Sequence, residues 1–222
     1  MSGDPLARLI QSVPAAFFRA TLEYTHDAFG EALALTNRHY EMPERVAMLG
    51  QNRHARCEPA FRLAAQEAGM SVLTPHTDPI GGRYSVASSG AITVIRGNVQ
   101  RHCGTPRATK FRRQYATVNR YLSAQQLHLL EQLPPPLSDR MCAMLVVTAH
   151  GPRVGDPSVP AFVGLGIPRH DLSSWLRLLS LNELLALYHD ADAKAHALRE
   201  PPVKVKDKAQ PMLKRRSPES GT

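Results

Sequence analysis

Residues 141–147 read MCAMLVV, an apolar run that no polar side chain interrupts. A short run of this kind is typical of a buried central strand. The next stretch, GPRVGDPSVP at 151–160, is rich in Gly and Pro and indicates an exposed turn. AFVGLGIP at 161–168 then predicts a partner strand. This pair of strands indicates a sheet at the centre of the fold.

Three more strands are predicted upstream, at residues 71–74, 83–87 and 91–99. Ser88-Ser89-Gly90, between the last two, is typical of a tight hairpin. Side chains alternate along a strand, so Ile92 and Val94 share one face of the last strand and Ile95 lies on the other. We therefore expect both faces of the sheet to be partly covered.

Helices are predicted at residues 14–36, 42–50, 58–68 and 107–132, and from Asp171 or Ser173 through Tyr188 and up to Arg199. Pro59 is expected to open the third helix and Gly69 to stop it. Trp175 is expected to anchor the last helix in the core. The order of elements predicts an α+β fold: a mostly antiparallel sheet of about five strands with N-terminal helices, a central helix and a C-terminal helix.

The chain has 222 residues, of which 43% are hydrophobic and 21% charged. We predict a flexible N-terminus at residues 1–12, a single α+β domain at 13–199 and a disordered basic tail at 200–222. No apolar stretch approaches the length of a membrane-spanning helix. Three widely spaced cysteines do not form a disulfide framework, so a cytoplasmic protein without a membrane partner is expected.

The net charge of +8 is unevenly distributed along the chain. Residues 79–130 contain no Asp or Glu and eight basic side chains, while both flanking regions are mildly acidic. Such a segment attracts polyanions or an acidic protein surface. We predict that an anionic partner binds the residues Arg96, Arg101, Arg107, Lys110, Arg112, Arg113 and Arg120.

Within the basic segment, helical spacing gives residues 107–121, RATKFRRQYATVNRY, two distinct faces. Lys110, Arg113 and Arg120 are expected on the outward face, where guanidinium groups bind phosphate or carboxylate. Phe111, Tyr115 and Val118 are expected on the face that packs on the sheet. Tyr115 and Tyr121 have a second interpretation, as platforms for unpaired bases.

Motifs for catalysis are missing from the sequence. It contains no phosphate-binding loop, nucleophile elbow or zinc helix, and no cofactor or metal is expected. His54 and Glu58 are four residues apart, which suits acid–base chemistry, but Pro59 favours an exposed pair near a helix start. An alternative hypothesis is a hydrolase whose site is assembled from scattered residues, several of His26, Asp27, His54, Glu58, His102 and Cys103.

Residues 133–188, LPPPLSDRMCAMLVV…PAFVGLGIPRHDLSSWL…SLNELLALY, resemble a segment of uncharacterised bacterial proteins. Compact, Arg- and Ala-rich chains without catalytic motifs are similar to accessory proteins of plasmids and phages, including fertility-inhibition proteins of conjugative plasmids. The resemblance implies a bacterial origin on a mobile element and implies no activity or catalytic residue.

These observations predict a non-enzymatic accessory or regulatory protein that engages nucleic acid or a nucleoprotein machine through its arginines. Two alternatives stay open. One is an inhibitor that binds an acidic protein partner, for example to interfere with conjugative transfer. The other is the hydrolase with a scattered His/Asp/Cys site.

Overall fold

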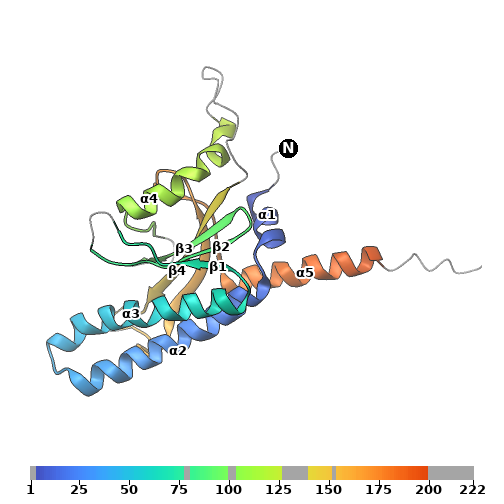
Figure 1. The fold of residues 1–222 in the computed structure, drawn as a ribbon. Coiled ribbons are helices and arrows are strands. Elements are labelled where there is room, and N and C mark those ends of the chain that lie inside the picture. The colour runs from blue at the N-terminus through green and yellow to red at the C-terminus, as the bar shows by residue number, and fades with distance from the viewer. Residues whose placement is uncertain (1–3, 78–80, 100–103, 127–139, 152–153, 200–222) are drawn as a thin grey trace, which may run out of the picture.

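A six-stranded sheet forms the centre of the fold (Figure 1). The computed structural model describes residues 4–77, 81–99, 104–126, 140–151 and 154–199. The strands run in sequence order across the sheet: β1 (Ser71–Leu73), β2 (Val86–Ser89), β3 (Ile92–Asn98), β4 (Met141–Ala149), β5 (Pro160–Pro168) and β6 (Trp175–Ser180). This arrangement confirms the α+β fold, with one strand more than expected.

Neighbouring strands are antiparallel except β3 and β4, which are parallel, with Ile92 opposite Met141 and Asn98 opposite Val147. Parallel neighbours need a long crossover connection. Here the crossover contains the helix α4 (Lys110–Ala116) and the 3-10 helix η1 (Thr117–Gln126). The predicted central helix is therefore confirmed over its described part, and residues 127–132 lie outside the described residues.

Alternate residues of β4 enter two different cores. Met141, Ala143 and Leu145 lie in the larger core, which also contains Phe17 and Phe61. Cys142, Met144 and Val146 lie in a second core that packs against α4 and η1. The apolar run at residues 141–147 is thus a central strand buried on both faces, as expected for its composition.

The face of the sheet that carries the larger core is covered by four helices: α1 (Pro5–Ser12), α2 (Ala15–His39), α3 (Glu44–Glu67) and α5 (Leu181–Arg199). α2 and α3 lie side by side as a long hairpin below the sheet (Figure 1). Phe17 packs edge-to-face on Phe18 and on Phe61, with ring centroids 5.0 and 5.6 Å apart. These ring contacts pack α2 against α3, and the three rings lie in the larger core together with Met141 and Leu145 of β4.

The prediction of two helices at 42–50 and 58–68 is wrong, because α3 runs unbroken through Pro59. The Pro59 side chain is exposed, while its neighbours Cys57 and Phe61 are buried in the larger core. Proline removes one helical hydrogen bond. Burial on both sides of Pro59 offsets that loss and keeps one helix.

The prediction that the last helix begins at Asp171 or Ser173 is also wrong. Trp175–Ser180 forms β6, and α5 begins only at Leu181. A capping box marks that start: Glu183 Oε2 accepts a hydrogen bond from Ser180 N–H at 2.8 Å, and Ser180 Oγ accepts one from Glu183 N–H at 3.2 Å. Trp175 therefore lies in a strand, with its indole N–H donating to the Gly104 carbonyl.

Pro5–Ser12, predicted to belong to a flexible N-terminus, forms α1 and buries Leu9. The Asp4 side chain caps this helix by accepting from Leu6 N–H. Tyr188 of α5 donates a hydrogen bond to the Val13 carbonyl at 2.6 Å, and so ties the end of this segment to α5. The predicted basic tail at 200–222 lies outside the described residues.

No helix over the described residues combines the length and the apolar content that crossing a bilayer requires.

The close packing of β5 against β6 can be tested by a substitution at Gly164. A Cβ at this position would lie 2.5 Å from the carbonyl oxygen of Leu179, a backbone atom that has no room to move. We expect Gly164→Ala to lower the free energy of unfolding by about 1–3 kcal/mol, measured by urea denaturation. Gly151→Ala is the control, since a Cβ there meets no atom within 4 Å. Equal stability of the two variants would contradict this account.

Candidate functional site

The part of the basic segment that follows β3 forms α4 and η1. Thr109 caps α4, because its side-chain oxygen accepts a hydrogen bond from Arg112 N–H at 3.3 Å. No acidic residue lies in the first turn of either helix. Phe111, Tyr115 and Val118 pack against the second core, as the helical spacing predicts. The opposite side of α4 and η1 therefore faces solvent.

Four basic side chains, on α4 and η1 or just before them, are exposed to solvent. We call the exposed set Arg107, Lys110, Arg113 and Arg120 the α4 surface. Within the described residues, the ion pairs are Arg56 with Glu31 and Arg96 with Glu58. Arg107, Arg113 and Arg120 thus have no carboxylate partner in the described part of the chain.

Three predicted site residues do not join this surface. Arg101 lies outside the described residues. Arg112 is half-buried and donates a hydrogen bond to the Arg107 carbonyl at 3.0 Å. Arg96 is only 4% exposed and points to the opposite face of the sheet, where α3 lies.

Asn119 fixes η1 to the sheet. Its amide donates to the carbonyls of Cys142 and Pro168, and its Oδ1 accepts from Cys142 N–H, all at 2.8 Å. β5 begins to pair with β4 only at Met144, so Cys142 has no strand partner on that side. The fully buried Asn119 side chain supplies the missing hydrogen bonds and positions the α4 surface.

We predict that Asn119→Ala lowers the free energy of unfolding by about 2–4 kcal/mol, because it leaves buried backbone groups of Cys142 and Pro168 unpaired. Asn119→Asp is the matched variant. It retains an acceptor for Cys142 N–H but places a carboxylate against two carbonyl oxygens, so it is expected to be no more stable than Asn119→Ala. Thermal denaturation followed by circular dichroism measures both, and wild-type stability of Asn119→Ala would refute the assignment.

Arg96 belongs to a buried charge cluster between β3 and α3. Its Nε donates to Glu58 Oε1 at 2.9 Å, and one terminal nitrogen donates to Asn98 Oδ1 at 2.8 Å. Ser85 N–H donates to Glu58 Oε2 at 2.9 Å. Burial alone would raise the pKa of the Glu58 carboxyl. The Arg96 guanidinium and the Ser85 hydrogen bonds outweigh burial, and the pKa lies below its ordinary value.

His54 completes the cluster from the preceding turn of α3. The second terminal nitrogen of Arg96 lies 2.5 Å from His54 Nδ1. A guanidinium only donates, so Nδ1 is the acceptor and the imidazole is neutral. Burial, together with the positive charge of Arg96, lowers the pKa of His54. The expectation of an exposed His54–Glu58 pair is therefore wrong, because a continuous helix turns both residues inward.

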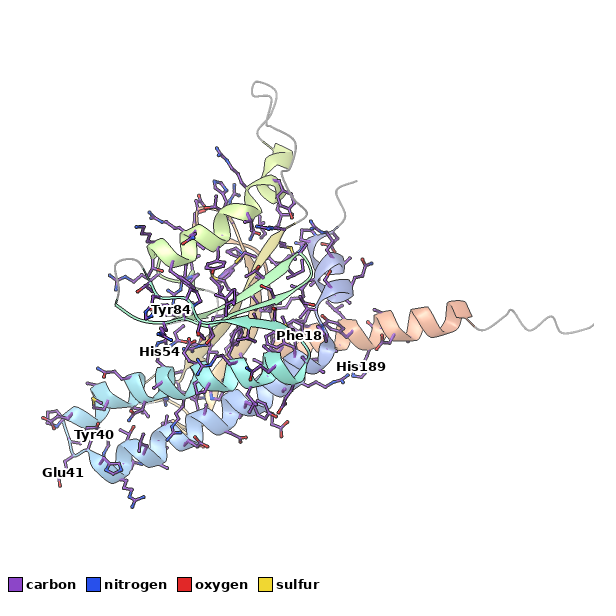
Figure 2. All side chains as sticks on the ribbon, in the orientation of Figure 1. Phe18, Tyr40, Glu41, His54, Tyr84 and His189 are labelled. Atoms are coloured by element: carbon purple, nitrogen blue, oxygen red, sulfur yellow. The ribbon has the colours of Figure 1, made fainter. Side chains whose placement is uncertain are left out.

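Sequence reasoning missed the partners of this cluster. Figure 2 shows Tyr84 directly above His54 of α3, and their ring centroids are 5.9 Å apart. Tyr84 also stacks on Phe111 of α4 at 5.0 Å, so aromatic rings connect α3 to α4. Only the spacing of His54 and Glu58 signalled the cluster, since Tyr84 and Asn98 belong to no motif.

His54 and Glu58 make stability fall with acidity in two steps. The unfolded chain protonates His54 near its ordinary pKa of 6.5 while the folded protein resists, so stability falls as the pH drops below that value. Below the ordinary pKa of 4.5, protonation of Glu58 removes the stability of its pair with Arg96. We expect urea midpoints to show both steps.

His54→Asn isolates the first step, because the amide oxygen replaces the Nδ1 acceptor without titrating. Its stability is expected to change less between pH 7 and pH 5.5 than that of the wild type. His26→Asn, at an exposed position of α2, is the control and should follow the wild type. Equal pH dependence of all three proteins would exclude His54 as the titrating group.

The scattered catalytic site is not assembled over the described residues. His26 and Asp27 are exposed on α2, whereas His54 and Glu58 belong to the buried cluster, and residues 102–103 lie outside the described residues. In the described ranges, no three His, Cys, Asp or Glu side chains are placed to hold a metal ion together.

Comparison of the chain with protein family models, curated proteins and solved structures finds no match.

Proposed function

We propose that this protein is a non-enzymatic accessory or regulatory factor that binds nucleic acid, alone or within a nucleoprotein machine, through the α4 surface. The observation that carries the proposal is the exposure of Arg107, Arg113 and Arg120 with no carboxylate partner in the described chain. Guanidinium groups on one surface without carboxylate partners attract the phosphates of a polyanion.

Contacts to phosphates fit this surface better than stacking on bases. Tyr115 packs against the second core, and Tyr121 is occupied by hydrogen bonds, one accepted from Arg8 at 2.8 Å and one donated to the Arg140 carbonyl at 2.7 Å. Guanidinium groups bind phosphate oxygens in bidentate fashion without reading sequence. Binding is therefore expected to depend strongly on salt and weakly on base sequence. Residues 133–188 resemble bacterial proteins of the plasmid and phage type, and this resemblance supports a factor that acts in bacteria on a mobile element.

Fluorescence anisotropy with labelled duplex DNA, single-stranded DNA and RNA tests the proposal. We expect Arg113→Glu/Arg120→Glu to weaken binding by about tenfold or more. For duplex DNA, the slope of log affinity against log salt should become shallower by about 0.9 for every phosphate that the variant no longer neutralises. Arg113 and Arg120 suit this test because both are exposed, whereas Arg112 is half-buried and its replacement would also disturb packing.

Arg19→Glu/Arg38→Glu is the matched control, with the same change of charge at two exposed positions of α2. It should bind nearly as well as the wild type. Absence of salt-dependent binding to all three nucleic acids, or equal loss in both double variants, would refute the proposal. Capture of an acidic protein that persists after nuclease treatment, and that Arg113→Glu/Arg120→Glu abolishes, would assign the surface to a protein partner instead.

A further inference from the structure

A cavity of about 120 Å³ lies between the α2–α3 hairpin and the carboxyl ends of β3 and β4. These are the one parallel pair in the described sheet. In open α/β sheets, ligands bind beyond the carboxyl ends of the parallel strands. The cavity has room for more than one water molecule. Its walls include Phe29, Gly50, Arg53 and Cys57 of the hairpin and Arg96 and Asn98 of β3.

Two guanidinium groups line this cavity, and no lining residue is acidic. The charge of Arg96 is balanced by Glu58, at 2.9 Å. Arg53 has no carboxylate partner within the described residues. The cavity therefore carries an excess of positive charge beside apolar walls, where an electrostatic interaction is stronger than in water.

Arg53 is held in place while one of its donors stays open. A terminal nitrogen donates to the Pro157 carbonyl at 2.5 Å, and the guanidinium lies 4.7 Å from the centre of the Phe29 ring. Its Nε is buried and has no hydrogen-bond partner in the described part of the chain. A buried donor without a partner costs free energy, which a bound acceptor would recover.

The other polar residues of the cavity suit an anion. Asn98 uses its Oδ1 to accept from Arg96, so its amide NH₂ is a further donor. Burial raises the pKa of the Cys57 thiol, which keeps it uncharged at neutral pH. Neither residue repels a negative ligand.

We propose that this cavity binds a phosphate group between Arg53 and Arg96. Guanidinium donors match the geometry of a tetrahedral oxyanion, and the ligand supplies the acceptor that Arg53 Nε lacks. The site is separate from the α4 surface, because no lining residue of the cavity belongs to α4 or η1. A failure of the proposed phosphate site would therefore not refute the proposed function of the α4 surface, and the reverse also holds.

Isothermal titration calorimetry with inorganic phosphate, at constant ionic strength set with chloride, tests the site. We expect saturable binding by the full-length protein and a loss of about tenfold or more in Arg53→Met, which retains an apolar stem on Phe29 but no donor. Arg56→Met, in the same helix at an exposed position, is the matched control and should bind like the wild type. A nucleoside 5′-monophosphate forms a second arm. Tighter binding of it than of phosphate would show that a larger molecule carries the phosphate group.

Gly50 offers a variant that removes no donor. It lies exposed at the edge of the cavity in α3, and a Cβ there meets no atom within 4 Å. Gly50→Leu should preserve or raise thermal stability, because leucine favours a helix more than glycine does, and should weaken phosphate binding by narrowing the entrance. Gly50→Ala gains the same helical preference with little bulk and should bind normally.

No saturable phosphate binding by the wild type would overturn the proposal, as would full affinity in a folded Arg53→Met. Arg113→Glu/Arg120→Glu is expected to retain phosphate affinity even where it loses nucleic acid. Parallel loss of both in that variant would place the phosphate on the α4 surface and exclude the cavity.

Discussion

The burial of β4 on both faces is the constraint on which the rest of the structure depends. Met141, Cys142 and the following residues are apolar, so side chains that alternate along the strand must all be shielded from water. The α2–α3 hairpin with α1 and α5 covers one face, and α4 with η1 covers the other. Since α4 buries only its aromatic side, the basic side is turned to solvent. The exposed charge is thus a consequence of how the central strand is covered.

The basic side chains of residues 79–130 lie in two environments. The alternation of side chains along β3 buries Arg96, whereas the helical periodicity of α4 and η1 exposes Arg113 and Arg120. Arg96 follows Ile92 and Val94 on the face toward α3. A buried guanidinium is tolerated there because Glu58 balances its charge, while Ser85 N–H satisfies the second oxygen of that carboxylate. Arg113 and Arg120 remain solvated on the outer face of their helices. A segment without carboxylates therefore supplies both a structural ion pair, with an acid from elsewhere in the chain, and an exposed surface.

The local sequence pattern predicted much of the secondary structure correctly. It failed where contacts between residues far apart in the sequence determine the structure. The apolar run of β4, the hairpin of β2 and β3 and the two faces of the central helix follow from local pattern. The turn of that hairpin lies at Gly90 and Ala91, not at Ser88-Ser89-Gly90 as predicted, because Ser88 and Ser89 pair with Thr93 and Ile92 in the sheet. The predicted helix break at Pro59 and the predicted helical start near Asp171 were wrong. Burial of Cys57 and Phe61 overrides the proline, and pairing with β5 makes Trp175–Ser180 a strand. The ion pair of Glu58 and Arg96 joins residues 38 positions apart, a distance that no spacing rule spans.

Arg53 and Arg96 differ in how the fold compensates their charge, and that difference separates structure from binding. Arg96 donates to a carboxylate, an amide and an imidazole, so its hydrogen-bonding capacity is largely satisfied within the protein. Arg53 is oriented by a carbonyl and an aromatic ring, neither of which carries a negative charge. Burial lowers the pKa of Arg53, yet a guanidinium stays protonated near neutral pH. A cation that is oriented by such contacts, partly desolvated and without a carboxylate partner among the described residues gains more from an incoming anion than a solvated one does, because less reorganisation is required. We therefore expect the proposed site beside Arg53 to bind a single phosphate more tightly than any one arginine of the α4 surface does, because the proposed binding by that surface depends on several weak contacts made together.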